Sequence, residues 1–357
     1  MFKIIDRYII RKFLGTYIFA IALLLAIVVM FDVNEKFDAF LKAPFKATLV
    51  DYFINFLPYF ANQFSPLFVF IAVIFFTSKL ASHNEIIAML SSGVSFRRLM
   101  QPYMLSALVI AACTWVMGAY IIPPANVKRI DYTNTYVKNK RVDYGSNIML
   151  MVAPGQIAYM SRYDNISKSG SRFQLDSFDP DKQLTSRLTA MRITWDTLYS
   201  WRLHDWVQRD FRDNREFITK GRTVDTIIPF EPRDFLIAKN DHEKMTSPEL
   251  AKYIERQRNR GVANIQSFEV EYQRRYAMCA AAFILTVIGM ALSSRKVKGG
   301  LGLNIGIGLV LSFSYILFMA ITQSFAYSGL TSPLVAMWIP NLLYTVIAIL
   351  LYRRAAV

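Results

Sequence analysis

Five long stretches without a charged residue dominate this sequence and limit the folds that it can adopt. They run from Phe13 to Phe31, Tyr52 to Ser78, Leu99 to Val127, Tyr276 to Ser294 and Gly299 to Tyr352. A helix rises about 1.5 Å per residue, so roughly 20 apolar residues cross a hydrocarbon core of about 30 Å. Each of the first four stretches fits one span. The last, with 54 residues, fits two spans joined by a turn at 328–333. The sequence therefore predicts six transmembrane helices.

The net charge of +15 is unevenly distributed among the segments that flank these spans. With a cytoplasmic N-terminus, the cytoplasmic segments hold twelve basic residues against only Asp6 and Glu85. The basic residues are Lys3, Arg7, Arg11, Lys12, Lys79, Arg97, Arg98, Arg295, Lys296, Lys298, Arg353 and Arg354. Such a bias predicts that both termini are cytoplasmic. Because these charges are divided among four short segments, we expect no nucleic-acid partner.

The segment from Lys128 to Arg275 separates the third and fourth spans and, by this orientation, lies outside the membrane on the periplasmic side. Residues 188–195 and 199–211 are rich in β-branched and aromatic residues and partly alternate in polarity. Turn pairs at Ser169, Asp179 and Lys220 punctuate the segment. Short strands at such spacing predict a sandwich or jelly-roll-like domain, whose strand order cannot be read from the sequence.

The sequence becomes helical in character after Asp241. Thr246 followed by Ser247, Pro248 and Glu249 has the pattern of a helix start, and the helix should reach about Asn259, with Gly261 as its terminator. A second helix from about Ile265 should lead into the fourth span. Three domains follow: residues 1–127 with spans one to three and a short cytoplasmic helix at about 82–92, residues 128–245 with the β domain, and residues 246–357 with the linker helix and spans four to six.

The loop between the second and third spans predicts that short amphipathic helix. Ser82 and Glu85 have the spacing of a capping box, and Gly93 ends the helix. Its apolar face consists of Ile86, Ile87, Met89 and Leu90. ABC permeases dock their ATPase subunits through such a helix, but a helix that lies on the lipid surface has the same pattern.

Catalytic patterns are not found in the sequence. The glycines that begin the fifth span at Gly299 lack the Lys-Ser/Thr pair of a phosphate-binding loop, and those at 302, 306 and 308 fit close helix packing. The spans carry no acid or base, which argues against a proton-coupled transporter or an intramembrane hydrolase. Cys113 and Cys279 fit apolar packing. We expect no metal site and no cofactor.

The loop from Lys79 to Arg98 resembles the Ser-Glu-Leu…Gly-Val-Ser coupling segment of the lipopolysaccharide-export permease family, the LptF/LptG type. Residues 5–9 resemble the family's N-terminal "DRYI" stretch, residues 35–42 its charged first outer loop, and residues 247–272 the segment that re-enters the membrane. The resemblance covers essentially the whole chain. His83 and Asn84 replace the usual residues before the glutamate, and the fourth span lacks a proline near its start.

This resemblance implies a permease subunit of an ABC exporter that extracts lipopolysaccharide from the bacterial inner membrane and passes it to a periplasmic bridge. The implied partners are a cytoplasmic ABC ATPase dimer, a second homologous permease and periplasmic jelly-roll bridge proteins. ATP hydrolysis belongs to the partner, so the chain itself is not expected to be an enzyme. A four-span ABC permease that releases lipoproteins or transmits motion, and a membrane-anchored structural or sensory protein, are the alternatives.

The resemblance also indicates candidate residues at both ends of the spans. In the family, the glutamate that matches Glu85 reaches into the ATPase. With it, the predicted coupling residues are His83, Ile86, Met89 and Gly93. Basic residues at the level of the outer leaflet are candidate ligands for lipid phosphates. These are Lys36, Lys42, Lys128 and Arg129. Arg97 and Arg98 are expected to anchor lipid headgroups, with contact to the ATPase as the alternative.

Overall fold

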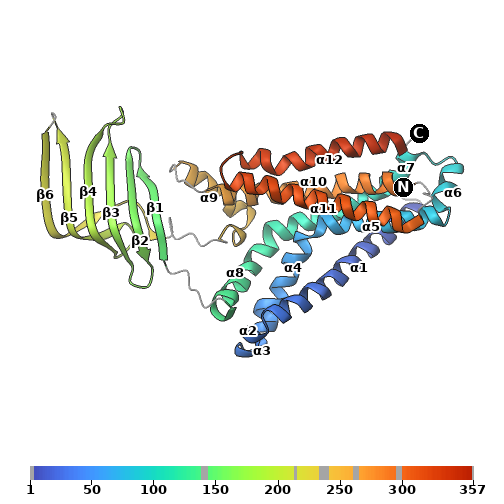
Figure 1. Ribbon diagram of the computed structural model, residues 1–357, viewed down its shortest axis with the longest axis horizontal. Helices are drawn as coiled ribbons and strands as arrows, with labels where there is room; N and C mark the ends of the chain where they lie inside the picture. Colours follow the sequence, from blue (N-terminus) through green and yellow to red (C-terminus); the bar gives the residue numbers. More distant parts are fainter. Residues whose placement is uncertain are drawn as a thin grey trace. The chain divides into compact units, whose positions relative to one another are not determined.

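The computed structural model describes residues 4–137, 144–212, 215–232, 241–259, 265–294 and 300–355. The chain forms two compact units. The helical unit contains residues 1–139, 243–248 and 266–357, and the β unit contains residues 140–242 and 249–265. Each unit is described by itself below (Figure 1).

Among the described residues, six helices of the helical unit are long and apolar enough to cross a membrane, as predicted. They are α1 (Ile4–Glu35), α5 (Ser65–Ser82), α7 (Phe96–Val116), α10 (Gln266–Ser293), α11 (Gly300–Tyr327) and α12 (Pro333–Ala355). Helix α7 continues without a break through η2 (Met117–Ile121), α8 (Ile122–Tyr132) and η3 (Thr133–Val137). The predicted turn between the last two spans contains Gly329, whose φ is +77°.

The second uncharged stretch forms two helices rather than one long span. Helix α4 (Ile54–Gln63) ends at Phe64, where the backbone leaves helical geometry, and α5 begins at Ser65 with Pro66 in its first turn. Only α5 has the length and hydropathy of a span. Between α1 and α4 lie the short helices α2 (Phe37–Lys42), α3 (Phe45–Ala47) and η1 (Thr48–Phe53).

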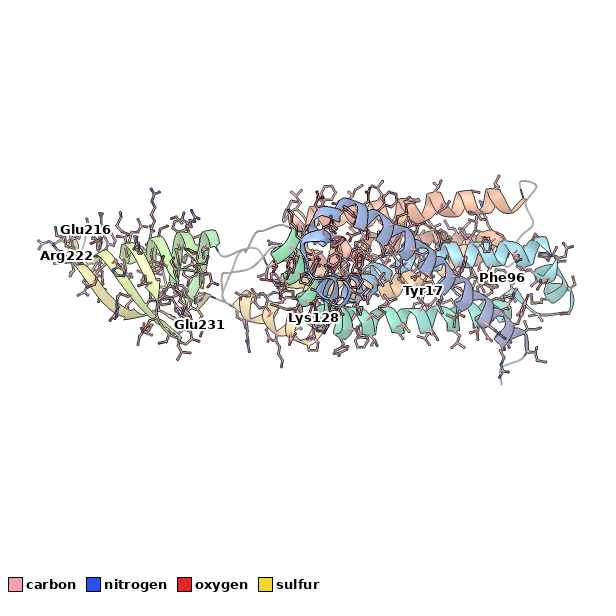
Figure 2. The ribbon with its side chains drawn as sticks, turned by 90° about the horizontal axis from the view of Figure 1, so that it is seen from below. Tyr17, Phe96, Lys128, Glu216, Arg222 and Glu231 are labelled. Atoms are coloured by element: carbon pink, nitrogen blue, oxygen red, sulfur yellow. The ribbon has the colours of Figure 1, made fainter. Side chains whose placement is uncertain are left out.

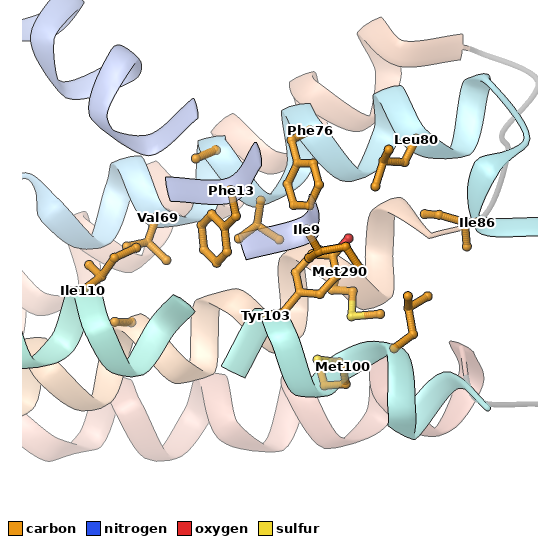
Figure 3. Close-up of a cluster of buried hydrophobic side chains, with 14 of the residues drawn as sticks. Ile9, Phe13, Val69, Phe76, Leu80, Ile86, Met100, Tyr103, Ile110 and Met290 are labelled. Atoms are coloured by element: carbon orange, nitrogen blue, oxygen red, sulfur yellow. The ribbon is translucent and has the colours of Figure 1, made fainter. Parts of the chain in front are cut away.

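Helices α5 and α10 form the centre of the bundle, and α1 lies at its edge. Helix α10 packs against α5, α7, α11 and α12, whereas α1 packs mainly against α5 and α7. In the most apolar stretch of each helix, 78% of the α5 residues but only 6% of the α1 residues are buried. The largest apolar cluster joins Ile9 and Phe13 of α1 to side chains of α5, α7 and α10 (Figure 3). Helix α1 therefore has most of its apolar surface left uncovered by the other described residues.

Both described ends of the chain lie at one end of the bundle, which we call the terminal end (Figure 1). Helix α8 and η3 lie at the opposite end, which we call the insertion end because the chain enters the β insertion there. Phe96 and Lys128 lie at these two ends, with Tyr17 between them (Figure 2).

The β unit contains one six-stranded antiparallel sheet in the order β1-β2-β3-β4-β5-β6. Its strands are β1 (Tyr144–Ala153), β2 (Gln156–Asp164), β3 (Ser169–Phe178), β4 (Leu184–Trp195), β5 (Ser200–Arg212) and β6 (Arg215–Ile227). The predicted inserted β domain and the two predicted strands are confirmed, although the described strands form one sheet and not the two packed sheets of a sandwich. The strand order, which the sequence left open, is that of a meander. Ser169 is the first residue of β3 and directly follows the turn at 165–168, whereas Lys220 lies inside β6, so the turn predicted at Lys220 was wrong.

One row of residues interrupts the pairing at the same level on every strand. The unpaired positions are Asn147, Ser161, Arg172, Met191, Asp205 and Arg222. Across this row the burial pattern shifts by one residue, so that Met160 and Tyr163, three positions apart, are both buried on the same face. Strict alternation would place residues three apart on opposite faces. We call this line the kink row.

The buried face of the sheet is covered by the chain that follows β6. The rings of Trp201 and Phe230 pack in a tilted arrangement with centroids 4.6 Å apart, and the Trp201 indole donates to the Phe230 carbonyl oxygen at 3.0 Å. Helix α9 (Ser247–Asn259) follows, with the bounds predicted from the sequence. The glycine predicted to end it, Gly261, lies outside the described residues.

Candidate functional site

A short helix at the terminal end, α6 (Glu85–Ser91), occupies the predicted coupling segment. The capping box predicted for it is wrong. Ser82 belongs to α5, and its hydroxyl donates to the Lys79 carbonyl oxygen at 2.8 Å. Asn84 precedes α6 with a left-handed φ of 60° and makes no side-chain capping bond. A tight left-handed turn rather than a hydroxyl cap therefore separates α5 from α6.

Gly93 ends α6 in the way that the sequence predicts. Its φ is +86°, and its N–H donates to the Leu90 carbonyl oxygen at 3.1 Å. The N–H of Val94 donates to the Met89 carbonyl oxygen at 3.3 Å, which completes the Schellman pair of bonds. A side chain at position 93 would impose strain because residues other than glycine rarely adopt this φ.

The apolar residues of α6 point in two directions. Ile86 is 1% exposed and lies in the cluster that contains Ile9 of α1, and Met89 packs against the same cluster (Figure 3). Ile87 and Leu90 are exposed, as is His83 just before the helix. Of the predicted coupling residues, Ile86 and Met89 thus fix α6 to the bundle, whereas His83 belongs to its outward surface.

Glu85 connects α6 to the first turns of α1. The Tyr8 hydroxyl donates to Glu85 Oε2 at 3.2 Å. Two residues earlier on α1, Asp6 accepts a hydrogen bond from Arg98 at the start of α7 at 2.6 Å. Asp6 is 6% and Arg98 33% exposed at the side chain, so this pair is partly buried. The predicted headgroup anchor Arg98 is therefore engaged within the protein.

At the insertion end, three of the four predicted phosphate ligands line one pocket of about 610 Å³. Asp6 and Lys36 are 30 residues apart, and Arg98 and Arg129 are 31 apart, which is about 45 Å of helix in each case. A bilayer with its headgroups is about 40–45 Å thick. When the Asp6–Arg98 pair lies among the headgroups of one leaflet, Lys36 and Arg129 reach those of the other.

Lys36 is held within the pocket wall. Its ammonium pairs with Asp32 and donates to the Tyr52 hydroxyl at 2.5 Å, and it lies 5.8 Å from the centre of the Phe56 ring. Asp32 is buried, and its second oxygen has no hydrogen-bond partner among the described residues. A lysine ammonium has three donors, so one remains for a ligand. A bound anion would have to share Lys36 with Asp32.

The other predicted ligands differ in their surroundings. Lys42 is exposed and lines the pocket without an ion pair among the described residues. Arg129 also lines the pocket, but it donates to Asn126 Oδ1 at 3.0 Å and pairs with Glu243 at 3.1 Å. Lys128 is exposed and does not belong to the lining. Within this pocket, Lys42 is the most available cation.

The pocket joins these cations to an aromatic wall. Tyr52, Phe56, Phe60 and Tyr136 form its apolar side, and Glu35 and Asp38 supply acidic groups at its margin. An amphiphile with a negatively charged head matches this combination, because the cations and the rings lie side by side.

Over residues 7–354 the sequence matches the family described as lipopolysaccharide export system permease LptF/LptG. The chain belongs to this family. The match covers nearly the whole chain and confirms the family resemblance that the sequence motifs indicated. No curated protein matches the sequence. Family membership makes this chain a permease subunit of the inner membrane rather than a catalytic enzyme.

A buried ionic cluster of this LptF/LptG-family chain was not predicted from the sequence. Glu271 pairs with Arg274 at 2.7 Å and with Arg275 at 3.0 Å, and the Glu271 and Arg275 side chains are 8% and 5% exposed. Arg275 also donates to the Ser247 hydroxyl and to the Met245 carbonyl oxygen, both at 3.0 Å. The cluster thus fastens the chain that returns from the β insertion to the start of α10.

Arg129 holds the same returning segment from the other side. It pairs with Glu243, and the Asn126 amide donates to the Glu243 carbonyl oxygen at 3.2 Å. The spacing of Glu271 and Arg275, four residues apart before an apolar stretch, is the sequence signal that could have revealed this cluster. Arg129 therefore lines the pocket and also anchors the returning chain.

Proposed function

We propose that this chain is one permease of an ABC exporter that extracts lipopolysaccharide from the inner membrane and passes it to a periplasmic bridge. The observation that carries the proposal is the contact of Glu85 with Tyr8, which joins the coupling helix α6 directly to the first span. A movement imposed on α6 from outside the membrane would reach α1 through this contact and through Ile86.

The orientation follows from charge. The terminal end carries the basic flanks of the chain, including Arg353 and Arg354 in the last turn of α12. The positive-inside rule supports a cytoplasmic terminal end and a periplasmic β unit. Helix α6 would then face the cytoplasm, where a separate ATPase dimer hydrolyses ATP. Its exposed Ile87 and Leu90, with His83 and Glu85 beside them, supply an apolar and acidic docking surface.

A second permease would cover the exposed side of the bundle. Helix α1 exposes Ile18, Phe19 and Leu23, and α11 exposes Val310 and Phe313. These faces support a cavity for acyl chains that forms between two permeases, with α1 lining it. Gly302 and Gly306 support the same arrangement, since a Cβ on either would meet no atom of the described residues within 4 Å. By contrast, Gly308 packs against Ile74, as predicted for a glycine at a helix contact.

Lipid phosphates would bind at the pocket of Lys36 and Lys42. The aromatic wall beside these cations suits the boundary between the headgroup and the acyl chains. The sheet of the β unit would then pass the lipid to periplasmic partners. Among the described residues, its edge strands β1 and β6 are each paired on one side only, and strand addition is a simple way to extend such a sheet.

Co-purification from detergent-solubilised membranes tests the proposal. Wild type should bring down an ATPase and a second permease together with lipopolysaccharide. Glu85→Gln should lose the ATPase or its lipid-stimulated hydrolysis, whereas Glu255→Gln, at an exposed carboxylate of α9, should behave as wild type. If wild type purifies without any nucleotide-hydrolysing partner, a structural or sensory role replaces the exporter.

A second pair of variants tests the phosphate site. Lys42→Gln should lower the amount of co-purified lipopolysaccharide, because Lys42 lines the pocket and no described acidic side chain pairs with it. Lys128→Gln provides the matched control, since Lys128 is equally a cation of the insertion end but does not line the pocket. If both variants co-purify with the same amount of lipopolysaccharide, the pocket does not bind the transported lipid.

A further inference from the structure

A second groove lies near the terminal end of the bundle, on a side formed by α7, α10 and α12. It has a volume of about 560 Å³, is open to the outside, and is lined along α7 by Arg97, Gln101, Met104 and Leu108. Phe283 of α10 and Tyr352 of α12 complete its apolar wall. The α7 residues recur every three or four positions, so they form one continuous strip along that helix.

The length of the groove matches one leaflet. Arg97 and Leu108 are eleven residues apart, which is about 16 Å of helix. The hydrocarbon core of a bilayer is about 30 Å thick, so a single leaflet contributes roughly half of it. The groove therefore runs from the headgroup level, marked by the neighbouring Asp6–Arg98 pair, to about the middle of the membrane.

The mouth of the groove carries an exposed cation, Arg97. Arg98 pairs with Asp6, but Arg97 is exposed, and among the described residues no acidic side chain pairs with it. A guanidinium presents five donors in a fork that fits a phosphate group. Gln101 lies one turn further along the strip and adds an amide donor below Arg97.

We propose that this groove binds an anionic phospholipid, with Arg97 holding its phosphate and one acyl chain lying along α7 as far as Leu108. Two observations select this occupant over a protein segment. The charge at the mouth complements a phosphate, and the apolar length below it equals that of an acyl chain in one leaflet. The inference is independent of lipopolysaccharide export, since it concerns a different face and the opposite leaflet from the Lys36 pocket.

Native mass spectrometry of the full chain tests this site. The protein is reconstituted in nanodiscs of equal parts phosphatidylglycerol and phosphatidylcholine, released into mild detergent, and the retained lipid is counted. One cation at the membrane surface is worth about 1 kcal/mol toward an anionic lipid, which is about fivefold in affinity. Arg97→Gln should therefore retain phosphatidylglycerol about fivefold more weakly than wild type, and Arg97→Lys should keep most of the affinity.

Two further variants separate the headgroup from the acyl chain. Leu108→Trp fills the inner part of the groove without changing charge, and Leu108 is 52% exposed, so the fold should tolerate it. It should also lower phosphatidylglycerol retention. Arg11→Gln removes an exposed cation of α1 that is not in the groove and should change nothing. The proposal is overturned if Arg97→Gln retains as much phosphatidylglycerol as wild type, or if wild type retains phosphatidylcholine equally well. Capture of a protein by a cross-linker placed at position 108 would also overturn it.

Discussion

Neutralising Glu271 should destabilise the bundle far more than neutralising an exposed carboxylate. Glu271 faces two guanidinium groups at 2.7 and 3.0 Å, and its side chain is 8% exposed. In Glu271→Gln both Arg274 and Arg275 lose their carboxylate while they stay buried. Breaking a buried ion pair in this way costs about 3–5 kcal/mol. Because Arg274 is 15% exposed and can regain some water, we expect the lower value, about 3 kcal/mol.

The free energy of unfolding in mixed micelles, titrated with sodium dodecyl sulfate and followed by helical circular dichroism, measures this loss. Glu35→Gln is the matched control, because Glu35 is an exposed glutamate of the same unit and should change the value by less than about 0.5 kcal/mol. Glu271→Gln/Arg275→Met should cost less than the sum of its two single changes. If Glu271→Gln behaves like Glu35→Gln, the carboxylate does not hold the two guanidinium groups and the anchoring of the returning chain is refuted.

Three further predictions concern other parts of the chain. Tyr8→Phe removes a hydrogen bond of 3.2 Å to α6, so ATP hydrolysis in the reconstituted exporter should continue while the lipid released per ATP falls about twofold to tenfold. Gly289→Ala should destabilise the bundle by about 1–3 kcal/mol, because the added Cβ would lie 2.9 Å from a side chain of α5, whereas Gly306→Ala should stabilise the isolated chain by up to about 1 kcal/mol in the same titration. The Arg202 hydrogen bond lowers the pKa of Asp225, so this carboxylate stabilises the fold at neutral pH and loses its effect as the pH falls through that lowered pKa; a pH titration should show the difference between wild type and Asp225→Asn disappear in acid.

The six spans could be predicted because hydrocarbon selects for long uncharged runs, and that property is local in sequence. The ends of the helices could not. Helices α1 and α7 continue beyond the apolar stretches. The helix that begins with α7 runs for 42 residues, from Phe96 to Val137. Where a helix leaves the hydrocarbon, its end depends on contacts with other segments, such as the Lys36–Tyr52 bond, rather than on hydropathy.

The coupling segment shows a second limit of sequence reasoning. The position of the helix and its end at Gly93 could be predicted, since a positive φ favours glycine in any context. The start could not, because Ser82 continues α5 and Asn84 makes the turn instead. The division of its apolar residues between the bundle and the outside also depends on how α6 lies on α1. The sequence predicts the apolar face of α6 but not the helices against which it packs.

The sequence could predict the candidate cations from their position along the helices, but it could not predict which of them pair with an acidic side chain. Lys36, Lys42 and Arg129 meet in one pocket, and Lys128 does not, although it is adjacent to Arg129 in the chain. Asp32 and Glu243 take up part of the charge of two of these cations. Asp32 and Lys36 have the i,i+4 spacing that a sequence can show, but Glu243 lies 114 residues from Arg129, so only the folded chain reveals that second pairing.

The kink row of the β unit limits how this sheet can change during evolution. Each strand crosses the row at one position, for example Ser161 in β2 and Met191 in β4. Deleting one residue from a single strand on one side of the row would move its own crossing point away from those of its neighbours, and would turn its apolar side chains to the opposite face. Insertions and deletions among relatives should therefore gather in the connections between strands, while the number of residues on each side of the row stays constant.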